Sequence, residues 1–211
     1  MKLLLAALLI LSLSLPCHAF QAARFEAING LPPVNGGIVA LGDSITAFMP
    51  MDTLYEEKIY NRGVSGMTTG QLLRHLPDLV TGYPDEIRIL IGVNDFLLAG
   101  IGPYVSFRNY QAILEWLVVN RPAAKIIVYS VLPTRSPYIN QNVRTLNGLL
   151  ASYVERQGED APITWVNLYP CMVDAQGLAK REYVSDAVHP TVAGYQEMVK
   201  ESMSKKPGGQ K

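Results

Sequence analysis

A serine, a histidine and an aspartate stand in this sequence in a pattern that permits nucleophilic chemistry. Ser44 follows the apolar run 38–41, which is typical of a strand buried on both faces. Asp186 and His189 lie three positions apart in a polar loop near the C-terminus. A hydroxyl, an imidazole that takes its proton and a carboxylate that orients the imidazole are the groups of a serine hydrolase. The three residues therefore form a candidate catalytic set.

A serine nucleophile also needs hydrogen-bond donors for the oxyanion that forms when it attacks an acyl carbonyl. The candidates are the backbone N–H groups of Ser44 and Gly63 and the side-chain amide of Asn94. Each residue also has a plainer interpretation. Ser44 is also acceptable as a turn residue, Gly63 as a turn glycine at positive φ, and Asn94 as a loop former. Asp186 also suits the N-cap of the last helix.

Apolar runs separated by helical patterns indicate how these residues are brought together. The predicted strands are residues 38–41, 59–62, 87–91, 125–132 and 163–168. The predicted helices are residues 51–58, a helix from Thr68 that Pro77 bends or ends, 105–120, 142–157 and a last helix opened by Pro190. This alternation predicts an α/β fold: a three-layer α/β/α sandwich with a five-stranded parallel sheet in the order 2-1-3-4-5. The candidate residues follow the carboxyl ends of strands, which share one edge of such a sheet.

Four short blocks carry a resemblance to a known family. They are Gly-Asp-Ser at 42–44, Asn-Arg-Gly-Val-Ser-Gly at 61–66, Gly-Val-Asn-Asp at 92–95 and Asp-Ala-Val-His-Pro at 186–190. These blocks follow one another in the same order as those of the SGNH (GDSL-type) hydrolases, which they resemble, and they stand at the predicted strand ends. The resemblance extends over about residues 38–195, and its one visible departure is Ile45, where the family motif has leucine.

The resemblance implies a role for each of five residues. Ser44 corresponds to the nucleophile, Gly63 and Asn94 to the oxyanion hole, and His189 with Asp186 to the base and its orienter. The implied activity is that of a serine esterase, which hydrolyses carboxylic esters through an acyl-enzyme without a metal or a cofactor.

The expected substrates are esters with short to medium acyl chains, because a chain of this length has few insertions with which to build a deep tunnel. The apolar side chains of Phe96, Leu98 and Ile101 follow Asn94 and are predicted to line the acyl pocket, unless they only cover the sheet edge. The alternatives are a lysophospholipase or thioesterase acting on long acyl chains, an acyltransferase, and a non-catalytic carbohydrate-binding protein. The sequence leaves open whether the ester is a small molecule, a lipid or a glycan.

The N-terminus predicts export. Residues 1–19 combine a basic start, an apolar core and a small-residue cleavage site, as in a signal peptide, so a periplasmic or secreted location is expected. Residues 20–203 are then one hydrolase-like domain and 204–211 a flexible tail. No other run approaches the length of a membrane span.

Charge and cysteine content exclude several function classes. Without residues 1–19 the chain carries 17 basic and 18 acidic residues and has no basic cluster, so nucleic-acid binding is not expected. Only Cys171 remains in that chain, which rules out an internal disulfide and a cysteine-ligated zinc. Its two histidines are His75 and His189, and His75 is predicted to be structural.

Overall fold

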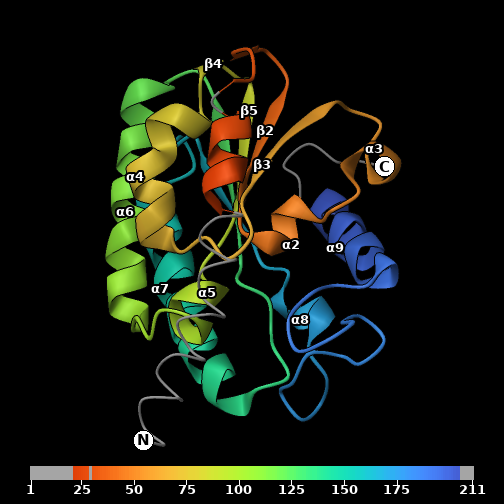
Figure 1. Cartoon of the computed structure of the whole chain (residues 1–211). Coiled ribbons are helices and arrows are strands. Elements are labelled where there is room, and N and C mark those ends of the chain that lie inside the picture. The colour runs from red at the N-terminus through yellow and green to blue at the C-terminus, as the bar shows by residue number, and fades with distance from the viewer. Residues whose placement is uncertain (1–20, 29, 205–211) are drawn as a thin grey trace, which may run out of the picture.

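A parallel sheet of five strands forms the centre of the computed structural model, which describes residues 21–28 and 30–204 (Figure 1). Across the sheet the strands are β3 (Ile59–Gly63), β2 (Ile38–Gly42), β5 (Glu86–Leu90), β6 (Lys125–Tyr129) and β7 (Ile163–Val166). Numbered along the chain, this order is 2-1-3-4-5, which confirms the predicted topology.

The carboxyl ends of three neighbouring strands meet at one edge of the sheet. Gly42 of β2 pairs with Gly63 of β3 on one side and with Leu90 of β5 on the other. The segments that follow these three residues therefore leave the sheet side by side. In open α/β sheets this edge is where ligands bind.

Helices cover both faces of the sheet, and for this reason all five residues of β2 are buried. One face carries α4 (Thr69–Leu79), α6 (Pro103–Asn120) and α7 (Pro137–Gln157), on the left in Figure 1. The other carries α9 (Val192–Ser204) with the short helices α2 (Ser44–Ala47), α3 (Met51–Leu54) and α8 (Tyr169–Met172). The remaining short helix is α5 (Val93–Leu97), which follows β5.

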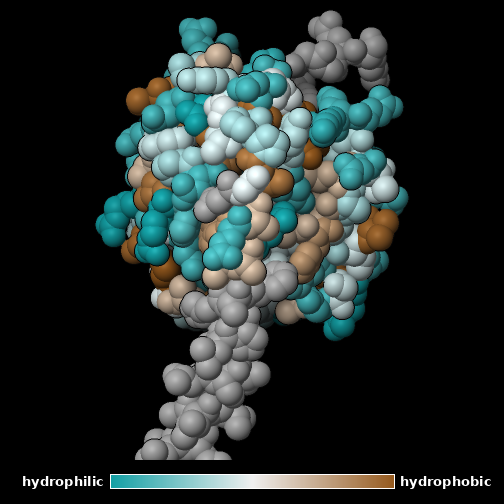
Figure 2. All heavy atoms as spheres, turned by 45° about the horizontal axis from the view of Figure 1, so that its top comes forward, coloured by the Kyte–Doolittle hydropathy of each residue, from teal (hydrophilic) through white to brown (hydrophobic). Residues whose placement is uncertain are grey.

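Helix α4 shows how the pattern of apolar residues fixes this packing. Its side chains Leu72, Leu76 and Leu79 recur at helical spacing and are buried in the core. Each such leucine contributes about 1.5–3 kcal/mol through burial of apolar surface. On the face shown in Figure 2, hydrophilic residues predominate and strongly hydrophobic ones are scattered among them.

Several predicted helix boundaries were wrong. Pro77 does not end α4, which continues to Leu79. The predicted helix 51–58 ends already at Leu54, and the helix expected from residue 142 begins at Pro137. Helix α9 begins at Val192 rather than at Pro190, because the Thr191 hydroxyl accepts the N–H of Gly194, whereas Pro190 bridges to Val184.

Two elements occupy a stretch that the sequence indicated only as a lead-in to the first strand. Residues 21–28 form a helix (red in Figure 1), whose Phe25 stacks on His75 of α4. Strand β1 (Val34–Asn35) then pairs in parallel with β4 (Gly82–Tyr83) in a separate two-stranded sheet.

The expected signal peptide, residues 1–19, lies outside the described residues. So does the expected tail, except for Ser204, which is the last residue of α9. Within residues 21–28 and 30–204, no helix is both long enough and apolar enough to span a membrane.

Candidate active site

Ser44 stands where β2 ends, at the first position of α2. The Asp43 carboxylate accepts the N–H of Ile45 and so caps this helix. The tight turn from strand to helix aims the Ser44 side chain at the loop between α8 and α9. There the Ser44 hydroxyl oxygen lies 2.9 Å from Nε2 of His189.

The His189 ring is held from its other side by Asp186. Asp186 Oδ2 lies 2.7 Å from His189 Nδ1. An ionised carboxylate can only accept hydrogen bonds, so Nδ1 carries the ring hydrogen. Nε2 is then free to accept the proton of the Ser44 hydroxyl, which is the arrangement required of a general base.

The second oxygen of Asp186 fixes the loop itself. Asp186 Oδ1 accepts the N–H groups of Val188 and His189, at 2.7 and 2.9 Å. Partial burial raises the pKa of Asp186, but these two N–H groups and the His189 ring outweigh it and hold the pKa at about 2. Asp186 is therefore ionised at neutral pH. It does not cap the last helix, a role that Thr191 takes instead.

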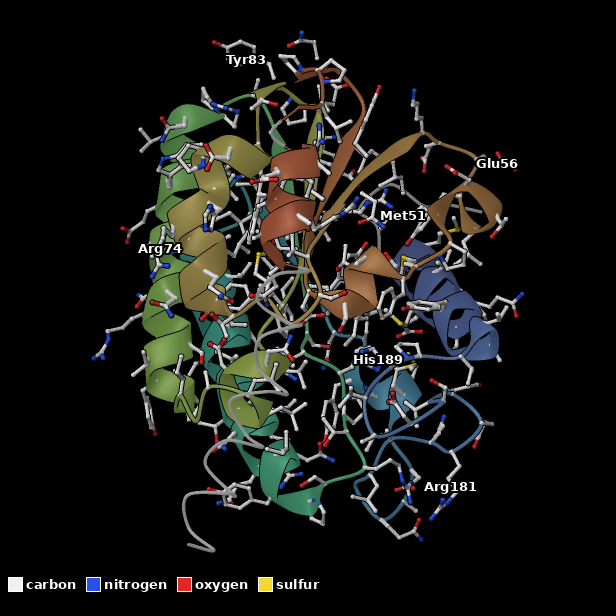
Figure 3. The ribbon with its side chains drawn as sticks, viewed as in Figure 1. Met51, Glu56, Arg74, Tyr83, Arg181 and His189 are labelled. Carbon is white, nitrogen blue, oxygen red and sulfur yellow. The ribbon has the colours of Figure 1, made fainter. Side chains whose placement is uncertain are left out.

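Neighbouring elements hold this loop against α2. The N–H of Arg135 donates to the carbonyl of Ala187, and the ring centroid of Phe48 lies 5.6 Å from that of His189. The Tyr195 hydroxyl of α9 donates to the carbonyl of Ile45 at 2.8 Å and ties α2 to α9. Figure 3 shows His189 on its loop beside α2.

Asn94 enters the same edge from the first turn of α5. Its Nδ2 donates to the carbonyl of Met67 at 3.2 Å, and its side chain is buried. An amide nitrogen carries two hydrogens, so one remains for a ligand. The adjacent Asp95 accepts both the N–H and the hydroxyl of Thr69 and locks α5 to the start of α4.

Gly63 lies at the predicted edge, but its N–H is already occupied. It donates to Asn61 Oδ1 at 2.9 Å and so does not offer the free oxyanion donor that was expected. Nor does Gly63 have a positive φ. A glycine is required there because a Cβ would lie 2.4 Å from the backbone nitrogen of Ala47 in α2.

The turn that follows β3 offers a backbone donor that sequence reasoning missed. The N–H of Met67 donates to the carbonyl of Val64, with Gly66 at φ 75° between them. Among the described residues, the Gly66 N–H has no hydrogen-bond partner. Gly66 directly precedes Met67, the residue whose carbonyl accepts from Asn94. The only sequence signal was a second glycine in the 61–66 block.

Asp43, next to Ser44, is buried, and its carboxyl group has a raised pKa. Burial raises its pKa to about 7, although the N–H of Ile45 and the positive charge of His189 act in the opposite direction. The negative charge of Asp95 raises the pKa further. In its observed contacts Asp43 shapes the turn that presents Ser44.

The three residues predicted to line an acyl pocket lie in different environments. Phe96 is buried in the hydrophobic core, Ile101 is half-buried, and the Leu98 side chain is 64% exposed. Of the three, Leu98 is the most exposed, and it lies one helical turn after Asn94. His75, expected to be structural, stacks on Phe25 and lies 3.5 Å from Asp78 Oδ2.

Residues of the described segments form no cluster of three or more His, Cys, Asp or Glu side chains suited to a metal ion. The Asn and Ser side chains of the site have neutral oxygens. Its carboxylates are engaged elsewhere: Asp186 with His189, Asp43 with the backbone and Asp95 with Thr69.

Comparison with known proteins places this geometry in a family. The family model of GDSL-like lipases and acylhydrolases matches residues 40–197. The chain belongs to this family. The resemblance to SGNH hydrolases that the four blocks suggested is thereby confirmed, and the protein is grouped with hydrolases.

Curated relatives of this GDSL-like hydrolase include an acetylxylan esterase from Geobacillus stearothermophilus. It is 26% identical over 180 residues, which cover 78% of this chain and 81% of the esterase. N-acylneuraminate cytidylyltransferases of Streptococcus agalactiae are 24% identical over 153 residues, which cover 72% of this chain. The chain spans about a third of the length of these cytidylyltransferases, 34%.

Solved structures show the same fold. A Streptococcus pneumoniae protein provisionally described as a platelet activating factor superposes with a TM-score of 0.83 at 27% identity, covering 94% of this chain and 98% of its own. A GDSL-like lipase from Bacteroides thetaiotaomicron superposes with a TM-score of 0.72 at 26% identity, covering 86% and 95%.

Proposed function

We propose that this GDSL-like hydrolase is a serine esterase that cleaves carboxylic esters through an acyl-enzyme. The observation that carries the proposal is the hydrogen-bonded series from Ser44 through His189 to Asp186, with contacts of 2.9 and 2.7 Å. Ser44 Oγ attacks the ester carbonyl while His189 Nε2 takes its proton. The imidazolium, stabilised by Asp186, then protonates the leaving alcohol. Water repeats the sequence on the acyl-enzyme and releases the acid.

The proposed oxyanion hole combines three donors around Ser44. The Ser44 N–H stands at the start of α2, where helical N–H groups have no partner within the helix. The second is the free hydrogen on Asn94 Nδ2. For the third we favour the N–H of Gly66 over that of Gly63, because the Gly63 N–H is bonded to Asn61. Such fixed donors stabilise the charge that develops on the carbonyl oxygen.

We further propose that the acyl group is short to medium in length. The cavity beside α2 has a volume of about 200 Å³ and is lined by Ala47, Phe48, Gly63, Ser65 and Arg24. A cavity of this size lies below the 300–1,000 Å³ of typical ligand pockets, so it favours small groups. The acetylxylan esterase relative supports the same assignment.

The proposal is tested with p-nitrophenyl esters from acetate to palmitate. We expect kcat/KM to be highest between acetate and hexanoate and to fall beyond. A steady rise out to palmitate would instead favour a lysophospholipase or thioesterase, and the absence of turnover on every ester would favour a non-catalytic binding protein. Leu98→Ala is expected to change this dependence on acyl length, while Val119→Ala, at a still more exposed position on α6, serves as the control.

We also propose that the chain is exported, on the strength of residues 1–19 alone. The measurement is the N-terminal sequence of the protein recovered from the periplasm or the medium. Export with cleavage after Ala19 gives a chain that starts at Phe20. An intact Met1 on protein found only in the cytoplasm would contradict this proposal.

A further inference from the structure

The helix of residues 21–28 places a cation beside the candidate active site. Arg24 reaches the end of β3, where its Nε donates to the carbonyl of Gly63 and its Nη2 to the carbonyl of Asn61, both at 3.2 Å. These two bonds occupy one edge of the planar guanidinium. The N–H groups of the other edge, on Nη1 and Nη2, have no partner among the described residues. Arg24 is thus fixed in position, and one edge of its guanidinium remains available to bind a ligand.

Arg24 also borders a cavity. Arg24 lines the cavity of about 200 Å³ together with Ala47, Phe48, Gly63 and Ser65. The hydroxyl of Ser65 is buried and has no hydrogen-bond partner among the described residues. The cavity is therefore lined by the apolar side chains of Ala47 and Phe48 and by the cationic Arg24, and the unpaired Ser65 hydroxyl is buried at its side.

Helix α2 connects this cavity to the nucleophile. The N–H of Phe48 donates to the carbonyl of Ser44 at 2.9 Å, so the two residues are one helical turn apart. The Phe48 ring lines the cavity and also faces the ring of His189. Phe48 is therefore shared between the cavity and the surroundings of His189, whose ring centroid lies 5.6 Å from that of Phe48.

In the part of the chain that the structure describes, the positive charge of Arg24 has no acidic partner. A second guanidinium, that of Arg62, lies close enough to interact with it: burial and the charge of Arg24 both lower the pKa of Arg62. Within the described segments, neither arginine forms an ion pair with a carboxylate. Residues 1–20, 29 and 205–211 contain no Asp or Glu that could supply one. No ion pair among the described residues therefore neutralises these two guanidinium groups.

We infer that this cavity binds a carboxylate carried by the substrate and that Arg24 is the residue that recognises it. One free guanidinium edge presents two N–H groups, which match the two oxygens and the single charge of a carboxylate. The inference rests on the proposed esterase function and narrows it: the preferred esters bear an acidic group in their acyl or their alcohol part.

The test compares matched esters with and without the charge. On the alcohol side the pair is 4-acetoxybenzoate and 4-acetoxybenzamide. On the acyl side it is the p-nitrophenyl monoester of adipate and p-nitrophenyl hexanoate. Each kcat/KM is divided by the hydroxide-catalysed rate of the same ester. We expect the charged member of at least one pair to be favoured about tenfold, as for one charge-assisted contact.

Variants separate recognition from structural support. Arg24→Gln is expected to abolish this preference and Arg24→Lys to retain part of it, while Arg74→Gln on the outer side of α4 leaves it intact (Figure 3). Added salt should reduce the preference in the wild type. If Arg24→Gln slows the charged and the neutral ester by the same factor, or if neither pair shows a preference, the inference is wrong.

A binding measurement keeps this outcome distinct from failure of the esterase proposal. Calorimetric titration with adipate and with 4-hydroxybenzoate requires no turnover. We expect at least one of these acids to bind the wild type about tenfold more tightly than Arg24→Gln. Equal affinity for the two proteins overturns the carboxylate site even if the neutral esters are hydrolysed.

Discussion

The two halves of the candidate site differ in how far they are exposed to solvent. The acid–base half lies open: the side chains of Asp186 and His189 are 54% and 30% exposed. The oxyanion half is buried, with Asn94 at 6% and Asp95 at 0%. The candidate site thus combines one solvent-exposed set of groups with one that is embedded in the core.

In the proposed mechanism, this difference in exposure follows from the role of each half. Donors for an oxyanion act best when they are fixed before the charge appears, and burial among core contacts fixes them. Asp95 does this for Asn94 through its two bonds to Thr69. A base must exchange protons with the leaving alcohol and with water, so His189 has to be reachable. Its orientation is then supplied by local bonds from Asp186 rather than by packing.

The largest expected effect is on the exposed half. His189→Ala removes the base, and we expect kcat/KM on p-nitrophenyl acetate to fall by at least about 10⁴-fold, because triad members act as a unit. The matched control is His75→Ala, which removes the other histidine of the residue 20–211 chain and should retain most of the activity. A loss below tenfold in His189→Ala would show that another group serves as the base.

The buried half is tested with Asn94→Ala. Removal of one oxyanion donor is expected to lower kcat by about 10²–10³ with little change in KM, because the donor acts mainly in the transition state. Asn120→Ala, an exposed asparagine at the end of α6, is the control. If KM rises while kcat is unchanged, Asn94 binds the ground-state ester and is not an oxyanion donor.

Asp186→Asn measures how much an exposed residue that orients the base contributes to kcat/KM. Water can reach His189 Nδ1 and replace part of the lost bond, so we expect kcat/KM to fall by about 10², less than in His189→Ala. Steady-state kinetics of the two variants, measured under the same conditions, decide which substitution causes the larger loss. A larger loss in Asp186→Asn than in His189→Ala would reverse the assigned roles.

The smallest effect is on stability and concerns Asp43, at the junction of the two halves. Its folded pKa of about 7 lies above the ordinary value of 3.8 because of burial. The folded chain therefore holds this proton more tightly than the unfolded chain, and the wild type loses stability as the pH rises from about 4 to 7. Asp43→Asn removes that loss and keeps an oxygen that can cap Ile45.

The measurement is the thermal unfolding midpoint of Asp43→Asn and of the wild type between pH 5 and 8. We expect the midpoint of the variant to rise relative to that of the wild type by a few degrees between pH 5 and pH 8. Asp52→Asn, at an exposed position of α3, is the control. A difference that stays constant with pH would place the titration on another group.

The sequence predicted the sheet order, which depends on strand patterns. It also predicted that Ser44, Asn94 and His189 follow strands at one edge of the sheet, because parallel strands share a carboxyl edge. It did not predict the hydrogen bond from the Gly63 N–H to Asn61, because Asn and Gly are both ordinary turn residues and their types alone do not indicate this bond. The contact between Arg24 and Gly63 spans 39 positions and joins two segments with no shared pattern. Only the folded chain reveals such pairs.

The central claim is that Ser44 is the nucleophile activated by His189, and covalent labelling tests it most directly. The protein is treated with a fluorophosphonate, digested, and the modified residue located by mass spectrometry. We predict one added phosphonate on Ser44, slow or absent labelling in His189→Ala, and none in Ser44→Ala. Labelling at another residue, or unchanged labelling and esterase activity in Ser44→Ala, would contradict the account.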